Sequence, residues 1–394
     1  MLSPLSWQCA RQVPAGLPSC GSLRGRAGVP LPSRAMRFGL SDEQELLQAM
    51  LREFAAKELP APRLREIFDA GNGWDAALWR GAAGVGLQGL AVAERYGGAG
   101  LELLELALAF EVLGEAVLPG PFLGHALAAL ALSRGGSDAQ RERWLPKFAS
   151  GEAIGALAIA ESGDIWEPGQ WSAALDGGAV RGVKQFVDHA AIADVFVVGV
   201  CGGRLALVER SANGVQIDPV DGLDRTRALA RVELDGAAAD LLPGGSDVAD
   251  AVCDAGRILL AADAFGAAWK LIEMTVEYTL TREQFGTPLA QFQGVKHEIA
   301  NLAAQTEPMR GLFWYAAHAF DHLPDESAAA ACAAKAHVPD RAVHVSRQVI
   351  ELHGGIGFTW ESDVQFWAKR VLFDRSWLGG PRAHRERLAA LENW

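Results

Sequence analysis

The spacing of apolar residues divides this chain into two helical parts separated by a strand-rich part. From Ser41 to about Gly151, apolar positions recur every three or four residues, and SDEQELLQAMLREFAAKEL opens with a capping serine followed by acidic residues. Between Ala153 and Leu242, short apolar pieces such as VFVVGV and RLALVE are separated by turn signals such as DGG and SANG. From Ser246 to Val349 the helical spacing returns. This order predicts an α+β fold with segregated helices and strands, not alternating βαβ units.

The changes of pattern also predict the domain boundaries. We expect a helical domain over residues 38–152, a compact antiparallel β-domain over 153–244 and a second helical domain over 245–394. Residues 1–35 contain four arginines and no acidic residue, which is typical of a transit peptide or of an upstream leader read in frame. We therefore expect residues 1–37 to be a disordered leader or the product of a mis-assigned start, with Met36 as the alternative first residue.

Composition excludes several functional classes. Half of the 394 residues are hydrophobic and the formal net charge is -12, so the chain can bury a large core but lacks the basic surface that nucleic acids require. No apolar run reaches the roughly 20 residues of a membrane-spanning helix, so we expect no membrane span. Five cysteines without CxxC spacing indicate a reducing compartment, with neither a disulfide framework nor a zinc site. The expected location is the bacterial cytoplasm, or the mitochondrion if residues 1–35 are a transit peptide.

The stretch IELHGGIGFTWE, residues 350–361, contains three glycines and a histidine and allows three interpretations. A dinucleotide-binding turn needs GxGxxG after a strand, but the sixth position is Trp360 and the surroundings are helical. An oxyanion hole of the HGG type belongs with a GxSxG nucleophile motif, which the sequence lacks. The third interpretation is a flavin site between packed helices, where bare glycine backbone approaches the cofactor.

A second stretch, LTREQFGTPLAQFQGVKHEIANL at residues 280–302, favours the flavin interpretation. Arg282, Gln284 and Gly286 crowd a helix end or kink, with Pro288 close behind. Such a break exposes backbone N–H groups and an arginine that can hold a pyrophosphate with two hydrogen bonds. On its own, the stretch also fits an ordinary helix break with a surface arginine.

Two histidines on one predicted helix could be taken for metal ligands. His318 and His322 lie one helical turn apart, with Asp321 between them. Without a third ligand in a recognisable pattern, such a pair is typical of a solvated helix face, so we expect no metal site.

The motifs together resemble the acyl-CoA dehydrogenase family. REQFGTPLAQFQ is similar to that family's flavin-binding segment, LHGGIGFTWE to its C-terminal GGxGF segment, and AERYGGAGLELLELALAFEVLGEA to part of its N-terminal helical domain. The resemblance runs from about Leu40 to Leu388 and implies the family's three-part fold, which ends in a four-helix bundle. It also implies FAD, an acyl-CoA substrate and an α,β-dehydrogenation, in which a carboxylate takes the α proton and flavin N5 takes the β hydrogen as hydride.

The same resemblance assigns residues and partners. It implies a homotetramer, or a heteromer with a homologous subunit, in which each FAD is clamped between subunits and an acceptor similar to electron-transfer flavoprotein takes the electrons. KQFVDHA aligns with the segment that stacks an aromatic ring on the flavin and hydrogen-bonds N5, roles that fall to Phe186 and Asp188. From one subunit, the FAD pyrophosphate and its surroundings would be held by Arg282, Gln284, Phe285, Gly286 and Gln293. From a second subunit, the same FAD would be approached by Glu351, Gly354 and Gly355.

The family's catalytic glutamate is missing from both positions that it usually occupies. One position holds Gly379, or Leu378 if the alignment shifts by one, and the other holds Gly256. Arg257, which the resemblance places in the substrate site beside the base, would then lack its carboxylate. The remaining candidates for the base are Asp254, Asp374 and Asp188.

Three hypotheses for the function follow. In the first, the chain is an acyl-CoA dehydrogenase with an unconventional base that acts on a bulky or branched acyl group, and the two glycines widen its acyl cavity. In the second, it is a partner subunit of a heteromeric dehydrogenase whose companion chain supplies the glutamate. In the third, it performs different flavin chemistry. Two further departures indicate a modified site: Glu351 replaces a common glutamine, and Asp188 replaces a hydroxyl donor.

Overall fold

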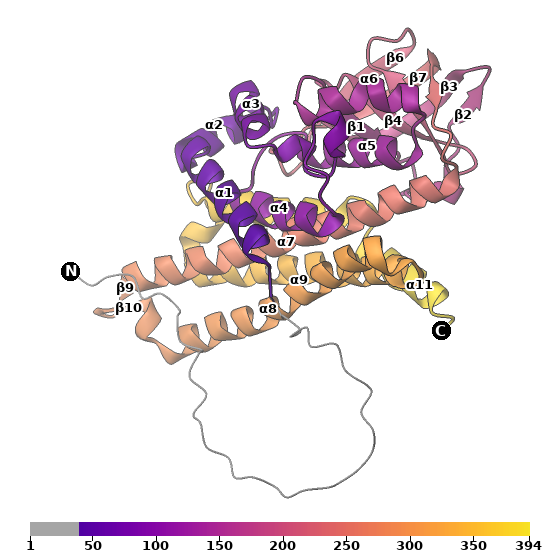
Figure 1. The fold of residues 1–394 in the computed structure, drawn as a ribbon. Helices are drawn as coiled ribbons and strands as arrows, with labels where there is room; N and C mark the ends of the chain where they lie inside the picture. The colour runs from indigo at the N-terminus through magenta and orange to yellow at the C-terminus, as the bar shows by residue number, and fades with distance from the viewer. Residues whose placement is uncertain (1–38) are drawn as a thin grey trace, which may run out of the picture. The chain divides into compact units, whose positions relative to one another are not determined.

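The computed structural model describes residues 39–394, so the predicted leader of residues 1–37 lies outside the described residues. Helices, two β-sheets and a second set of helices follow one another along the chain, which confirms the predicted α+β class (Figure 1). The first helices are α1 (Asp42–Glu58), α2 (Ala61–Ala70), α3 (Ala76–Gly84), α4 (Leu103–Ala116), α5 (Phe122–Gly135) and α6 (Asp138–Ala149). The later helices are α7 (Ser246–Thr281), α8 (Gln293–His322), α9 (Pro324–His353), α10 (Val364–Ser376) and α11 (Pro381–Leu391).

Polar caps set the starts of α1 and α6. The side chains of Ser41 and Ser137 each accept a hydrogen bond from the backbone N–H three residues later. In return, the side chains of Gln44 and Gln140 accept hydrogen bonds from the backbone N–H groups of the two serines. Such capping boxes satisfy N–H groups that no helical carbonyl reaches, so a helix begins directly after the serine. The serine cap expected from the sequence at the start of the first helix is therefore present.

Helix α4 lies directly on α7 because glycines face each other where the two helices cross. A Cβ on Gly114 would lie 1.9 Å from the carbonyl oxygen of Asp263, and a Cβ on Gly266 would lie 1.9 Å from that of Glu111. Only glycine permits so close an approach of two backbones. This crossing seats the N-terminal helices on the C-terminal bundle (Figure 1).

The middle part contains two four-stranded sheets, with strand orders β1-β4-β5-β8 and β2-β3-β7-β6. All strand pairs in them are antiparallel except β1 and β4, which run parallel with Gly155 opposite Val195. The predicted antiparallel β-domain is therefore confirmed apart from this pair. Parallel pairing is possible here because β2 and β3 intervene and supply the long crossover that it requires. The strands are β1 (Gly155–Ala158), β2 (Ala174–Asp176), β3 (Ala179–Asp188), β4 (Val195–Val200), β5 (Arg204–Glu209), β6 (Val215–Val220), β7 (Leu229–Ala238) and β8 (Asp240–Leu241).

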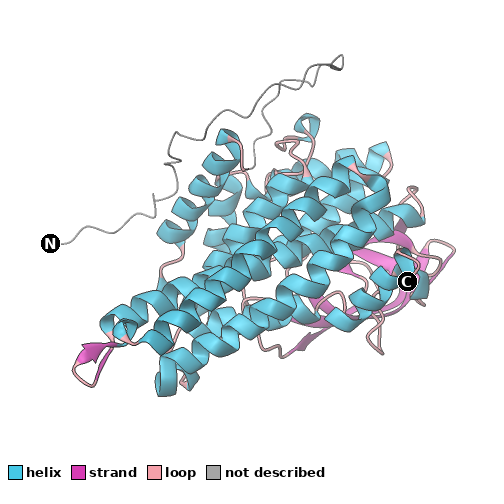
Figure 2. Ribbon diagram, turned by 90° about the horizontal axis from the view of Figure 1, so that it is seen from below, coloured by secondary structure: helices cyan, strands magenta, loops and turns pink. Residues whose placement is uncertain are grey.

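Helix α7 is the centre of the C-terminal bundle. It has 36 residues, and every residue from Val252 to Ala268 is buried. A helix that is buried on all sides needs other elements around it, and here α4, α5, α8, α9 and α10 surround α7. Figure 2 shows the long helices packed side by side, with the sheets near one end. The predicted four-helix bundle corresponds to α7–α10, and α11 packs on α9.

A buried arginine, Arg227, connects all three parts of the fold. It lies between β6 and β7, donates a hydrogen bond to the Gly120 carbonyl at 3.2 Å and pairs with Asp263 of α7 at 3.1 Å. Its side chain is 1% exposed. Because an unpaired charge at such depth is costly, each of these acceptors must stay in place.

A second arginine, Arg370 of α10, makes the same kind of connection. It donates to the Leu118 carbonyl at 3.0 Å and to Thr226 Oγ1 at 2.7 Å, and it pairs with Asp224 at 2.9 Å and with Asp263 at 3.1 Å. We refer to Arg227, Arg370, these partners and Asp188, which lies 3.9 Å from Arg227, as the buried junction. It fixes the orientation of the sheets relative to the bundle.

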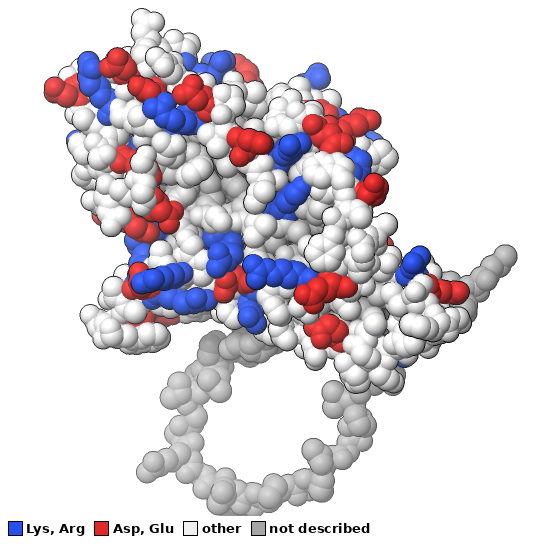
Figure 3. Space-filling view, turned by 180° about the vertical axis from the view of Figure 1, so that it is seen from behind, with Lys and Arg blue, Asp and Glu red and all other residues white. Residues whose placement is uncertain are grey.

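The surface carries charges of both signs. Figure 3 shows Lys and Arg side chains next to Asp and Glu on the face seen from behind. On α9, for example, Asp340 pairs with Arg375 at 2.9 Å and with Arg385 at 3.2 Å. Within residues 39–394, no helix is both long and apolar enough to cross a membrane.

Candidate functional site

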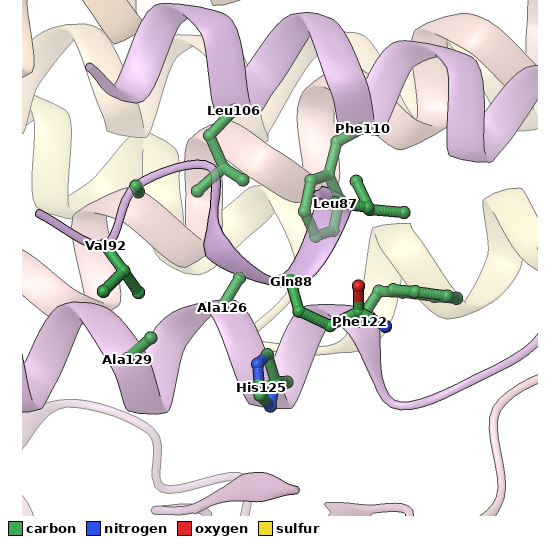
Figure 4. A pocket seen from close by; sticks show the side chains of 10 residues that line it. Leu87, Gln88, Val92, Leu106, Phe110, Phe122, His125, Ala126 and Ala129 are labelled. Carbon is green, nitrogen blue, oxygen red and sulfur yellow. The ribbon is translucent and has the colours of Figure 1, made fainter. Parts of the chain in front are cut away.

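The N-terminal helices enclose a void of about 10 Å³, which is too small for a substrate (Figure 4). His125 and Gln88 reach it between apolar side chains, and His125 Nε2 and Gln88 Oε1 have no hydrogen-bond partner among the described residues. Burial lowers the pKa of His125 to about 4, so its ring is neutral at pH 7. The void has room for about one water molecule.

A cleft of about 390 Å³ lies between the sheets and α10, and we call it the aromatic cleft. Its walls include Trp166, Phe186, Phe373 and Trp377. The rings of Trp166 and Phe186 are stacked with centroids 6.3 Å apart, and Trp377 is 5.5 Å from Trp166. Walls of this kind suit a flat ring system, which gains both apolar burial and stacking.

Phe186 reaches the aromatic cleft from a bulge in β3. The register against β7 shifts between Lys184 and Val187, and Phe186 has a φ of 51°. A left-handed backbone costs a residue other than glycine about 1–2 kcal/mol, and such strain collects at functional sites. The ring is 41% exposed, and the carbonyl of Phe186 accepts a hydrogen bond from Trp377 Nε1 at 3.0 Å. The ring is thus held where it can stack on a flat ligand.

Asp188 does not reach the aromatic cleft. Its carboxylate is fully buried and lies 2.6 Å from His189 Nδ1, with Arg227 3.9 Å away. Burial alone would raise the pKa of Asp188, but His189 and the nearby arginines outweigh it and lower the pKa. This side chain belongs to the buried junction, so the structure does not support its predicted contact with flavin N5.

A second cleft, of about 440 Å³, lies on the other side of Trp166, and we call it the acidic cleft. Trp166 and Asp164 line both clefts. The charged residues around the acidic cleft are four carboxylates and one guanidinium: Asp164, Glu167, Asp250, Glu386 and Arg387. Leu378 and Gly379 complete one wall. Such a lining is unfavourable for the phosphate groups of a CoA ester.

The two positions that lack the family's glutamate are neighbours in space. A Cβ on Gly256 would lie 2.5 Å from Leu378 Cδ1 and 3.2 Å from Leu127 Cδ1. Leu378 is fully buried, although its φ of 63° is left-handed. The leucine side chain therefore occupies the space that a side chain at position 256 would need. Gly256 does not widen an acyl cavity, whereas Gly379 does line a cleft.

The prediction that Arg257 lacks a carboxylate is wrong. Its guanidinium is buried and pairs with both Asp254 and Glu167 at 2.5 Å. Glu167 also pairs with Arg387, so it bridges the start of α7 and α11. Arg257 holds this acidic wall together through Nη1 and Nη2, and its buried Nε has no hydrogen-bond partner among the described residues.

None of the three predicted base candidates lines either cleft. Asp254 is buried against Arg257, and Asp188 is buried against His189. Asp374 on α10 is fully buried, and neither carboxylate oxygen has a hydrogen-bond partner within residues 39–394. Burial, reinforced by the charge of Asp263, raises the pKa of Asp374 well above its ordinary value. The structure therefore places none of these carboxylates where it could reach a substrate in either cleft.

We expect Asp374→Asn to stabilise the protein, and the gain to grow as the pH rises from about 4. A carboxyl with a raised pKa binds a proton more tightly in the folded state than in the unfolded state, so its contribution to stability falls as the pH rises above the unfolded pKa. Asparagine removes this loss, which is about 1.4 kcal/mol for each tenfold difference in proton affinity between the folded and unfolded states. Urea unfolding between pH 4 and 8 measures it.

Asp340→Asn is the matched control, because hydrogen bonds from Arg375 and Arg385 overcome the effect of burial and lower the pKa of Asp340. Its contribution to stability is present above the unfolded pKa and is lost as the pH falls, so the asparagine variant should be destabilised at neutral pH. Equal responses of the two variants to pH would contradict this account of Asp374.

The stretch around Arg282 forms a hairpin, not a simple helix kink. Strands β9 (Glu283–Gln284) and β10 (Thr287–Pro288) are joined by Phe285 and Gly286, which both have positive φ, as in a type I′ turn. Phe285 has a φ of 55°, and its side chain is 96% exposed. Arg282 and Gln284 are exposed beside it, as is Gln293 at the start of α8. The structure thus presents a strained aromatic tip and an arginine to the solvent.

The glycines of the GGIGF stretch form the turn η5 (Gly354–Phe358) at the end of α9. Gly354 has a φ of 64°, and a Cβ on either Gly354 or Gly355 would meet no atom within 4 Å. Glu351, one turn earlier on α9, is exposed and accepts a hydrogen bond from Gln348 at 3.3 Å. We call residues 354–358 the glycine turn.

The hairpin and the glycine turn lie at the same end of one chain. Tyr278, in the last turn of α7, donates a hydrogen bond to the carbonyl of His353 at 3.1 Å, and the two rings stack at 4.4 Å. The resemblance assigns the two segments to different subunits, whereas in the structure they adjoin within one chain. Because α7 and α9 pack side by side, one chain presents both segments together.

Sequence reasoning missed Asp164 and Glu167, which line the acidic cleft. Asp164 has a φ of 62° and accepts a hydrogen bond from Trp166 Nε1 at 2.6 Å. No local pattern reveals a left-handed aspartate or the arginines that meet Glu167.

The two histidines of α8 belong to a surface network. The rings of His318 and His322 lie 4.6 Å apart and are tilted by 32°, and His322 Nε2 lies 2.8 Å from Glu102. Asp321 pairs with Arg134 and accepts a hydrogen bond from the Leu103 N–H. Within the described residues, no group of three or more His, Cys, Asp or Glu is arranged to hold a metal ion.

Comparison with known proteins identifies the family. The model described as acyl-CoA dehydrogenase, N-terminal domain, matches residues 41–152, and the one described as acyl-CoA dehydrogenase, C-terminal domain, matches residues 244–391. Acyl-CoA dehydrogenase IpdE2 from Mycobacterium tuberculosis is 33% identical over 355 residues, which cover 90% of this chain and 98% of that protein.

Solved structures agree. A variant of the steroid ACAD Tcur3481-Tcur3483 has a TM-score of 0.83 at 32% identity and covers 89% of this chain and 98% of that chain. The acyl-CoA dehydrogenase of Bacillus anthracis, solved with FAD, has a TM-score of 0.80 at 23% identity, covers 90% of this chain and 68% of that chain, and shows the shared fold. FAD is the cofactor of this family. The chain belongs to the acyl-CoA dehydrogenase family of oxidoreductases.

Proposed function

We propose that this chain is a subunit of a heteromeric acyl-CoA dehydrogenase, in which it helps to hold FAD while a companion chain supplies the catalytic carboxylate. The observation that carries this proposal is the contact between Leu378 and Gly256. Neither family position for the base holds a carboxylate. The Leu378 side chain fills the space that Gly256 leaves empty. A chain that formed the whole site would need a carboxylate there to remove the α proton.

The exposed end of the bundle fits the phosphate region of FAD. Arg282 can hold a pyrophosphate with two hydrogen bonds, and the glycine turn leaves room for a ligand next to the backbone. Phe285 keeps a strained, almost fully exposed ring at the hairpin tip, which is unfavourable unless another molecule covers it. When bound, FAD would supply the hydride acceptor of the dehydrogenation.

The geometry of α7 supports the proposal that each FAD is shared between chains. Leu378, which follows Trp377 of the aromatic cleft, contacts α7 at Gly256, whereas Arg282 follows the end of α7 26 residues later. At 1.5 Å per residue these points are about 39 Å apart along the helix. Figure 1 shows the β9–β10 hairpin at the end of α7 away from the sheets. We infer that the hairpin completes the FAD site of a companion chain.

The proposed substrate is a CoA thioester of a bulky, ring-bearing acid. The relatives support this class, since one solved relative is described as a steroid enzyme. The acidic cleft also supports a heteromer in which the companion chain binds the substrate. The four carboxylates around this cleft disfavour the CoA phosphates in this chain. The companion's cleft would then bind the thioester, and a flavoprotein would accept the electrons.

The anaerobic visible spectrum tests the proposal. The full-length chain is purified alone and with a co-expressed homologue that carries the glutamate, and acyl-CoA thioesters, including ring-bearing ones, are added. We expect a thioester to bleach the flavin band only in the co-expressed complex. Bleaching in the chain alone would refute the proposed dependence on a companion.

A second variant tests the cofactor contact. Gly355→Val should strip FAD from the complex, because a Cβ at this position meets no atom of the described chain within 4 Å and the added side chain would fill the space proposed for FAD. Gly84→Val at the end of α3 is the matched control, since a Cβ there also meets nothing. Full FAD occupancy in the Gly355 variant would contradict the proposed contact.

A second candidate function keeps the whole reaction in this chain, with Asp164 as the base. Asp164 is exposed, has a strained backbone and lines both clefts. In that case the chain alone would bleach with a thioester, and Asp164→Asn would abolish the bleaching without releasing FAD.

A further inference from the structure

The segment that follows the glycine turn is held by a helix from the opposite end of the sequence. Arg65 of α2 donates hydrogen bonds to the carbonyls of Trp360 at 2.9 Å and Glu361 at 3.1 Å, and it pairs with Asp363. Trp360 lies 295 positions further along the chain. One guanidinium thus fixes three successive points of an otherwise exposed segment.

The side chain of Trp360 reinforces this anchor. Its ring lies 6.0 Å from the ring of Phe68 on α2, 4.4 Å from Lys369 Nζ on α10 and 6.0 Å from Arg225, which precedes β7. Two cations over one indole and a ring beside it hold the indole in place, although it remains 49% exposed. The N-terminal helices, the sheets and the bundle all contribute to holding this residue.

The glycine turn is therefore fixed at both ends. Tyr278 holds its start through the His353 carbonyl, and Arg65 holds the segment just after its end. Between these anchors Gly357 is buried, but Ile356 is 48% and Phe358 is 77% exposed. A turn of this kind can be presented in one conformation without being buried.

We propose that Arg65 is a positioning residue for FAD, because it fixes the outer end of the glycine turn that contacts the cofactor. This inference rests on the proposed contact between that turn and FAD. Binding to a preorganised turn avoids the entropy cost of ordering it, whereas a turn released at one end must be ordered when FAD binds. Arg65 itself does not touch FAD in this proposal; it acts through Trp360, Glu361 and Asp363.

The chain provides a matched control for Arg65 on the same helix. Arg63 pairs with Asp75 at 2.8 Å and with Glu58, and its side chain is 26% exposed, compared with 27% for Arg65. Arg63→Met and Arg65→Met therefore each remove one half-exposed guanidinium from α2. Only the second variant releases the segment after the glycine turn.

The experiment measures the dissociation constant for FAD, by flavin fluorescence, on the flavin-free full-length chain in complex with its companion. We expect Arg65→Met to weaken FAD binding by about tenfold or more, and Arg63→Met to change it by less than about twofold. The melting temperatures of the flavin-free variants should fall by similar amounts. Equal FAD affinity in the two variants would overturn the proposal.

Two further variants test the proposal if Arg65→Met does not fold, and separate it from the proposed FAD contact. If Arg65→Met does not fold, Asp363→Asn removes the ion pair but leaves both hydrogen bonds to carbonyls, so it should weaken FAD binding by about threefold; unchanged affinity would again refute the proposal. Gly355→Val separates the two levels of inference. If it weakens FAD binding and Arg65→Met does not, only the positioning role fails; if neither does, the proposed FAD contact fails as well.

Discussion

Replacing Arg370 by methionine is expected to lower the free energy of unfolding by about 3–5 kcal/mol, the usual cost of removing one partner from a buried ion pair. The methionine fills the space of the aliphatic stem, but Asp224 loses its cation and the Leu118 carbonyl loses its donor. Asp263 keeps only Arg227. Urea unfolding of the flavin-free chain measures the difference.

Arg375→Met provides the comparison, because Arg375 lies on the same helix but pairs with Asp340 at the surface, with 40% of its side chain exposed. Exposed pairs contribute about 0–1 kcal/mol, so this variant should unfold close to the wild-type midpoint. If the two variants lost equal stability, the buried junction would have no special role.

Replacing Gly256 by glutamate is expected to cost about 3 kcal/mol or more, although this change restores a glutamate at a family position. The new Cβ would lie 2.5 Å from Leu378 Cδ1, and the carboxylate would enter a packed, apolar region. Thermal and urea unfolding of the single variant test this. The chain should gain no dehydrogenase activity from it, because the carboxylate has no room to face a cleft.

The double variant Gly256→Glu/Leu378→Gly tests the cause of that loss. Leu378→Gly empties the space above position 256, and glycine adopts the φ of 63° without strain. We expect the two changes to be non-additive by at least about 1 kcal/mol, as is usual for residues in direct contact. Simple addition of the single losses would mean that Leu378 is not what excludes a side chain at position 256.

The sequence predicts the course of the chain well because local periodicity and capping determine it. The serine cap at Ser41 precedes α1, and the apolar run after Ser246 becomes α7, which is buried without interruption from Val252 to Ala268. The parallel pairing of β1 with β4 depends on a crossover through two intervening strands, which no local pattern encodes. Fold class could therefore be predicted, whereas sheet topology could not be predicted in full.

The site was less predictable because contacts distant in sequence decide it. Asp188 sits in the expected motif, yet Arg227 and His189 draw its carboxylate into the buried junction. Arg257 meets Glu167, 90 residues away, and not only its neighbour Asp254. The resemblance to the acyl-CoA dehydrogenase family predicts the two exposed segments proposed to bind FAD. It identifies neither the catalytic base nor the carboxylates that line the acidic cleft.

The buried junction also constrains how the protein forms during translation. Arg370 is synthesised after almost the whole chain, yet its acceptors include the Leu118 carbonyl and Asp224. Until α10 has left the ribosome, these groups must remain hydrated, and the regions around them cannot pack tightly without burying unpaired acceptors. The N-terminal helices and the sheets should therefore stay loosely packed on the ribosome, and a chain released before residue 370 should be a substrate for chaperones and proteases.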